Sequence, residues 1–296
     1  MATSHCDVMI IGAGPAGIAA AIQLRRCGVP TVLVEKERIG GLLWNANLVE
    51  NYPGFPNGIS GPRLVSLFER QLERTGVKVV FDEVKMLDIV ENMPIVETCS
   101  NVYRSPVVMI ASGTKPRPFP LEIPSNVQNR VFSSVCPLLK ARGKYVAIIG
   151  GGDAAFDYAL NLSRRNTVTI LNRQKEIQCL PLLWERARAC ASISYRDGIA
   201  VGQIAASETS DSLIVQCEAE GVESTVAADY VIFAIGREPQ MDFLSSRVME
   251  REQALIESGQ LYYVGDVKNG SLRQTAIAVG DGLRAAMQIY NIWRNG

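Results

Sequence analysis

The chain has 296 residues, 47% of them hydrophobic and 20% charged, a composition typical of a folded protein rather than a disordered one. Thirty basic residues balance thirty acidic ones, so no basic excess indicates a nucleic-acid or membrane-surface partner. No uninterrupted apolar run approaches the ~20 residues that cross a bilayer. The seven cysteines are scattered, with no CxxC or other metal-ligand spacing. We therefore expect two domains in a reducing cytoplasm, with no metal site.

The first predicted unit, residues 6–28, is a strand, a glycine turn and a helix, followed by a strand over 31–36. The turn reads Gly12-x-Gly14-x-x-Gly17. Such glycines allow a tight turn, close approach of the backbone to a pyrophosphate and tight helix–strand packing. Glu35 ends the next strand about twenty residues on, where a carboxylate can bind a ribose hydroxyl. The sequence therefore predicts a dinucleotide site near the N-terminus.

A second copy of the unit begins at residue 144 and continues into a strand over 167–171. Its turn reads Gly150-x-Gly152-x-x-Ala155, and alanine in the third position still permits close packing. No acid follows the strand; Asn172 and Arg173 stand there instead. A guanidinium pairs with phosphate, so Arg173 favours NADPH over NADH, although a solvated arginine is the alternative interpretation.

Two connections separate the units: a strand that runs into a Pro-rich stretch within 107–125, and a strand followed by Gly and Pro within 229–243. Residues 261–293 predict a strand, a turn and a long helix, and the first domain otherwise lacks its last strand and helix. The predicted fold class is α/β, with two Rossmann-type, three-layer dinucleotide-binding domains. The second domain, 112–241, is inserted between 1–111 and 242–296 of the first.

Six segments in this order resemble the low-molecular-weight thioredoxin reductases along nearly the whole chain. They are GAGPAG at 12–17, NYPGFPNGISGP at 51–62, IASGTKPR at 110–117, GGGDAAFD at 150–157, FAIGREP at 233–239 and VGDVKNGSLRQTAIAVGDGLRAA at 264–286. The resemblance implies FAD in the first domain, a pyridine nucleotide in the second, a homodimer and a cytoplasmic location.

The resemblance also implies individual site residues. Asp266 matches the aspartate that contacts the ribityl–phosphate chain of the flavin, and Asn51 the asparagine beside the flavin; a turn residue and a loop cap are the alternatives. A helix N-terminus at 273–275 would face the isoalloxazine, where its dipole favours negative charge. The residues expected to bind FAD are Gly12, Gly14, Pro15, Ala16, Gly17, Glu35, Lys36, Gly41, Leu42, Asn51, Val84, Ala111, Ser112, Gly113, Gly265, Asp266, Arg273, Gln274 and Thr275, and those expected to bind NAD(P) are Gly150, Gly152, Asp153, Ala154, Ala155, Asn172, Arg173 and Gly236.

The chain departs from that family where the family has a CxxC pair followed by an aspartate. Cys136 stands at the second cysteine, Ser133 replaces its partner, and Pro137 replaces the aspartate. A dithiol relay needs two sulfurs, because one thiolate attacks the external disulfide and the other resolves the mixed disulfide. We therefore expect no ordinary thioredoxin reduction. Cys136 is either a buried thiol or a redox-active cysteine that works alone.

Two more segments depart from the family. Its basic HRR signature with a further arginine becomes Asn172-Arg173-Gln174 with Gln178, which leaves NADPH against NADH open. The stretch 40–44, GGLLW, replaces a polar stretch beside the flavin, so either the pocket is more apolar or these side chains serve packing.

The leading functional hypothesis is an NAD(P)H oxidoreductase in which FAD reduces an acceptor directly. The acceptor would be a ferredoxin or flavodoxin, a quinone-like small molecule or oxygen. A second hypothesis is a disulfide or peroxide reductase that uses Cys136 alone. A third is a flavin-binding sensing or interaction protein whose nucleotide domain is idle.

Overall fold

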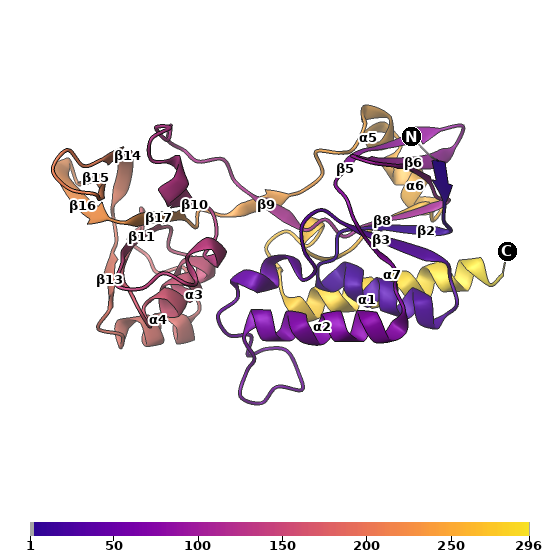
Figure 1. Cartoon of the computed structure of the whole chain (residues 1–296), viewed down its shortest axis with the longest axis horizontal. Helices are drawn as coiled ribbons and strands as arrows, with labels where there is room; N and C mark the ends of the chain where they lie inside the picture. The colour runs from indigo at the N-terminus through magenta and orange to yellow at the C-terminus, as the bar shows by residue number, and fades with distance from the viewer. Residues whose placement is uncertain (1–2, 296) are drawn as a thin grey trace. The chain divides into compact units, whose positions relative to one another are not determined.

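Residues 3–295 are described by a computed structural model (Figure 1). Contacts divide the chain into two compact units. Unit 1 contains the chain up to Trp44, Val49–Lys115 and the chain from Glu238 on, and unit 2 contains Asn45–Leu48 and Pro116–Arg237. The boundaries expected for the inserted domain, 112 and 241, lie a few residues outside unit 2. Asn45–Leu48 was expected in the first domain.

Unit 1 is built on a parallel five-stranded sheet in the order β19-β8-β2-β3-β4. The strands are β2 (Val8–Ile11), β3 (Thr31–Glu35), β4 (Val79–Phe81), β8 (Val107–Ile110) and β19 (Leu261–Tyr263). The helices α1 (Pro15–Arg26), α2 (Gly61–Thr75) and α7 (Thr275–Trp293) lie on one face of this sheet (Figure 1). The central strands read VMII and VVMI because a parallel sheet is covered on both faces.

The other face of that sheet packs on a second sheet in the order β1-β7-β6-β5, through a shared core that includes Met9, Ile110, Leu87 and Val96. Its strands are β1 (Thr3–His5), β5 (Val84–Val90), β6 (Met93–Thr98) and β7 (Val102–Arg104), and the short helices α5 (Ser246–Glu250) and α6 (Glu252–Glu257) complete the unit. Unit 1 is therefore a three-layer domain.

Unit 2 repeats the plan with a parallel sheet in the order β10-β17-β11-β12-β13. These strands are β10 (Val131–Phe132), β11 (Tyr145–Ile149), β12 (Thr167–Leu171), β13 (Ile193–Arg196) and β17 (Tyr230–Phe233). One core lies under α3 (Asp153–Leu162) and α4 (Pro181–Arg188), and the other under an antiparallel sheet of β14 (Ala200–Ala206), β15 (Leu213–Ala219) and β16 (Val222–Ala228). The expected α/β fold with two parallel-sheet dinucleotide-binding domains is confirmed.

Short elements connect the larger ones along the chain. They are the 3-10 turns η1 (Gly41–Asn45), η2 (Gln128–Arg130), η3 (Cys136–Leu138) and η4 (Gly265–Val267) and the strands β9 (Thr114–Pro116) and β18 (Arg237–Pro239). β9 and β18 pair with each other, so the two connections between the units form one ribbon. None of the helices within residues 3–295 is long and apolar enough to cross a membrane.

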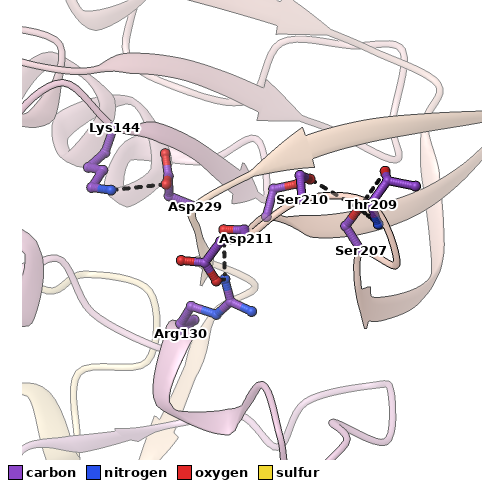
Figure 2. A network of polar contacts seen from close by, with 8 residues as sticks. Arg130, Lys144, Ser207, Thr209, Ser210, Asp211 and Asp229 are labelled. Carbon is purple, nitrogen blue, oxygen red and sulfur yellow. Dashed lines mark hydrogen bonds and ion pairs between the residues drawn. The ribbon is translucent and has the colours of Figure 1, made fainter.

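Polar contacts fasten the β14–β15 turn of unit 2 (Figure 2). Arg130 donates to the Asp211 carbonyl oxygen at 3.2 Å. Outside this turn, Lys144 Nζ lies 3.1 Å from Asp229 Oδ1, and these two residues directly precede β11 and β17. The Ser210 hydroxyl donates to Ser207 Oγ at 3.1 Å. Exposed ion pairs each contribute at most about 1 kcal/mol, so these contacts order a hairpin rather than form a site.

Candidate functional site

The glycine loop of unit 1 joins β2 to α1, and two of its glycines are required by close contacts. Gly12 has φ +105°, and a Cβ there would lie 2.5 Å from the Ala111 carbonyl oxygen. A Cβ on Gly17 would lie 1.9 Å from the Gly12 carbonyl oxygen. Gly14 differs, because a Cβ there would meet no atom within 4 Å. The space beside Gly14, at the N-terminus of α1, is therefore open.

Glu35 is held against this loop at the end of β3. Its Oε2 accepts from the Ala13 N–H at 2.8 Å, and its Oε1 accepts from the Glu37 N–H at 3.0 Å. Each carboxylate oxygen has two lone pairs, so the group can accept a further bond. Its placement fits a ribose hydroxyl.

The glycine loop of unit 2 has the same geometry. Gly150 has φ +137°, and a Cβ there would lie 2.3 Å from the Ala234 carbonyl oxygen, whereas a Cβ on Gly152 would meet nothing within 4 Å. Ala155, in the third position, is fully buried, so this helix accommodates the methyl group that Gly17 in unit 1 excludes. Each loop thus leaves its second glycine open at a helix N-terminus, which fits a diphosphate in both units.

Residues far apart in sequence meet at the other end of the unit 1 site. Asn51 Nδ2 donates to Gln274 Oε1 at 2.8 Å, and Gln274 directly precedes α7, which begins at Thr275. Asp266 lies in η4 and is half-buried. The structure therefore brings two of the expected FAD residues, Asn51 and Gln274, into contact.

Asp281 is a site residue that the sequence patterns did not indicate. It is buried on α7, and its Oδ2 accepts from the Gly265 N–H at 3.2 Å and from Asn269 Nδ2 at 2.7 Å. Lys268 Nζ lies 3.4 Å from its Oδ1. Asp281 therefore holds the turn that carries Asp266. The sequence signal that could have indicated Asp281 is an acidic residue on an otherwise apolar face of the predicted helix.

The GGLLW segment packs against the same glycine loop. The Gly40 N–H donates to the Ala13 carbonyl oxygen at 2.8 Å, and a Cβ on Gly41 would lie 3.4 Å from the Gly14 Cα. The Trp44 indole N–H donates to the Ile39 carbonyl oxygen, and the Arg38 guanidinium lies 4.6 Å from the centre of its ring. Trp44 is thus used in packing, whereas Leu42 is half-buried.

The remaining expected residues lie close to the two loops or at strand ends. The Ala111 N–H donates to the Ile11 carbonyl oxygen, and the Ser112 hydroxyl donates to the Gln240 carbonyl oxygen at 2.6 Å. In unit 2, Asp153 Oδ1 accepts from the Leu180 N–H at 2.7 Å. Pro15 and Ala16 begin α1, Ala154 follows Asp153 in α3, Gly113 and Gly236 flank β9 and β18, Val84 begins β5, and Lys36 is exposed after β3.

Cys136 begins η3 in unit 2 and is half-buried, and its N–H donates to Asn45 Oδ1 at 3.1 Å. Within residues 3–295 no disulfide joins any two cysteines. The neighbouring Asn47 N–H donates to Asp157 Oδ2 at 2.9 Å. Burial raises the pKa of Asp157 to about 6, although this N–H and the Arg164 guanidinium act in the opposite direction.

Comparisons of the sequence and of the fold with known proteins identify related oxidoreductases. The profile of the family described as pyridine nucleotide-disulphide oxidoreductase matches residues 6–282. The bifunctional thioredoxin reductase/thioredoxin of Mycobacterium leprae is 30% identical over 95% of this chain, which spans 64% of that longer protein. The thioredoxin reductase of Bacillus subtilis is 28% identical, with 96% of this chain and 94% of that protein covered. The crystal structure of Lactococcus lactis thioredoxin reductase has a TM-score of 0.86 at 26% identity, covering 98% of this chain and all of that one.

Proposed function

The chain belongs to the pyridine nucleotide-disulphide oxidoreductase family, and from this premise we propose that it is an FAD enzyme that oxidises NADPH and reduces an acceptor without a dithiol relay. The observation that carries the proposal is the pair of matching glycine loops, each with an open second glycine, in a chain with Ser133 where the relay needs a cysteine. Bound FAD would supply the redox chemistry, taking a hydride from the coenzyme and passing electrons to the acceptor.

The residues of unit 1 would bind and orient FAD. The N–H groups at the start of α1, beside the open Gly14, would bind the diphosphate, and Glu35 would bind the ribose. Asn51 and Gln274, which are bonded to each other, would lie beside the ring system with the N-terminus of α7. That helix end favours negative charge, which a reduced flavin carries.

The residues of unit 2 would bind the coenzyme. Gly152, with open space beside its Cα, and the N-terminus of α3 would bind its diphosphate. Arg173 is exposed and is the second residue after β12. Its guanidinium can pair with a 2′-phosphate, which supports NADPH as the coenzyme. NADH is the competing coenzyme.

The test is an anaerobic titration of the FAD-loaded protein with NADPH and with NADH, following flavin bleaching in a stopped-flow instrument. We expect fast bleaching by NADPH. If neither nucleotide bleaches the flavin while dithionite does, the oxidoreductase proposal fails and a flavin-binding protein with an idle nucleotide domain takes its place. With NADPH established, ferredoxin, flavodoxin, quinones and oxygen are the acceptors to compare.

A second copy of the chain is the partner we propose for α7. Ala276, Gly280, Leu283 and Met287 follow an i, i+4, i+7, i+11 pattern and are all exposed, which makes an apolar stripe on one helix face. A Met287→Arg variant should sediment as a monomer where the unmodified protein sediments as a dimer. Seven cysteines without a disulfide among residues 3–295 support a reducing compartment such as the cytoplasm.

A further inference from the structure

The two units can be compared residue by residue at the end of their second strands. Ile11 pairs with Val34 in unit 1, and Ile149 pairs with Leu171 in unit 2. The Gly12 N–H donates to the Val34 carbonyl oxygen at 2.8 Å, and the Gly150 N–H donates to the Leu171 carbonyl oxygen at 2.9 Å. Glu35 and Asn172 follow Val34 and Leu171. They therefore occupy the same position beside their glycine loops.

The two side chains use this position differently. Glu35 binds one loop N–H and keeps lone pairs for a ligand, as described above. Asn172 is only 4% exposed, and its amide lies so close to the loop that a Cβ on Gly151 would be 2.4 Å from it. Unit 2 therefore fills the place of the ribose-binding acid with a buried amide.

The hydrogen-bonding groups of this amide are largely used within the protein. Asn172 Nδ2 donates to the Tyr195 hydroxyl at 3.0 Å and to the Glu176 carbonyl oxygen at 3.3 Å, and Oδ1 accepts from the Gln174 N–H at 3.2 Å. Both N–H donors are engaged, and one acceptor lone pair remains. Asn172 can therefore offer a ribose 2′-hydroxyl little hydrogen bonding.

The same bonds fix the turn that carries Arg173. The Asn172 side chain bonds to Gln174 and Glu176 within the turn. The Asn172 backbone N–H donates to the Arg196 carbonyl oxygen, and its carbonyl oxygen accepts from the Ile199 N–H. Arg173 is exposed and makes no ion pair within residues 3–295, whereas Lys175 Nζ is paired with Glu220 at 2.6 Å. The available charge next to the amide is therefore the Arg173 guanidinium.

We propose that Asn172 is the specificity-determining positioning residue of unit 2: it withdraws the acceptor that a ribose hydroxyl needs and holds Arg173 in place for a 2′-phosphate. This inference rests on the proposed nucleotide site and deepens it, because it assigns the coenzyme preference to one buried amide. Arg173 supplies the charge, and Asn172 removes the competing mode of binding.

The test is Asn172→Asp in the FAD-loaded protein. The aspartate keeps acceptors for the Gln174 N–H and the Tyr195 O–H, loses the bond to Glu176, and restores an acid at the position of Glu35. Calorimetry with 2′,5′-ADP and with 5′-AMP measures the affinity of the adenosine site for each fragment, without hydride transfer. We expect 2′,5′-ADP to bind about tenfold or more weakly, as for the loss of one charged hydrogen bond, and 5′-AMP to bind no more weakly. The ratio of KM for NADPH to KM for NADH should rise by a similar factor.

Tyr195→Phe is the matched control, because it removes one partner of the amide and keeps the ring that packs on Phe156 and Trp184. Tyr195→Phe should change the Kd of either fragment by a smaller factor than Asn172→Asp changes the Kd of 2′,5′-ADP. Equal weakening of both fragments by Asn172→Asp would show a merely structural role and overturn the inference. So would an unchanged preference, or an unmodified protein that binds neither fragment. If 2′,5′-ADP is preferred as expected but NADPH does not bleach the flavin, the inference stands and the proposed function fails.

Discussion

Gly152→Ala separates binding from folding at the proposed coenzyme site. Gly152 has φ −91° and ψ −179°, an extended conformation that alanine adopts freely, and its Cβ would touch nothing in the protein. Replacing glycine at a compatible position stabilises a fold by about 0.4–1 kcal/mol, because the unfolded chain loses freedom. The same methyl group would occupy the space where a diphosphate approaches the backbone.

We expect Gly152→Ala to weaken coenzyme binding without weakening FAD binding or the fold. An added methyl group in a closely packed contact costs about 1–3 kcal/mol, which corresponds to roughly 5- to 150-fold weaker binding. In stopped-flow bleaching the apparent Kd for NADPH should rise by this factor, while the ratio of FAD to protein and the midpoint of thermal unfolding stay unchanged or rise slightly.

Two matched variants sharpen this experiment. Gly14→Ala places its methyl group in the equivalent open space of unit 1, so it should lower FAD retention instead. Gly150→Ala forces φ +137° on a residue whose Cβ would lie 2.3 Å from a carbonyl oxygen, so it should destabilise the fold itself. A Gly152→Ala protein with the unmodified Kd for NADPH would refute the assignment of this loop to the coenzyme.

Three further predictions test other residues. Cys136→Ser should leave flavin reduction and turnover with a small acceptor unchanged, and a loss of turnover would favour the single-cysteine mechanism. The folded-state pKa of Asp157, about 6 against 3.8, favours the protonated folded form, so about 3 kcal/mol of stability is present below pH 4 and lost as pH rises through 6. Relative to Asp157→Asn, the unmodified protein should therefore lose stability to urea between pH 5 and 7.5, and a gain over that interval would contradict this reasoning. Asp281→Ala leaves the Gly265 N–H and the Asn269 amide without their acceptor, which should cost about 1–3 kcal/mol of unfolding free energy and lower FAD retention. Asp242→Ala removes an exposed partner of Lys115 and should cost less than about 1 kcal/mol, and an equal loss from both variants would contradict the role of Asp281.

The sequence alone determined the features whose geometry is local. Each glycine loop is one strand, one turn and one helix start, so the spacing at 12–17 and 150–155 was enough to predict two dinucleotide-binding domains. The prediction that no dithiol relay operates came from residue types alone, since serine at 133 cannot form a disulfide. NADPH as coenzyme, the individual site residues and the acceptor stay predictions.

Only the tertiary structure decided the contacts between distant residues. Asn51 and Gln274 are 223 positions apart, and Asn47 and Asp157 are 110 apart, yet each pair is hydrogen-bonded. The sequence placed Asn172 among the residues expected to bind NAD(P), and the fold adds that its amide is buried and bonded to Tyr195, Gln174 and Glu176. Asp281 on α7 had no motif of its own. Periodicity and spacing describe neighbours along the chain, and which distant groups satisfy one another's hydrogen bonds is set when strands and helices pack.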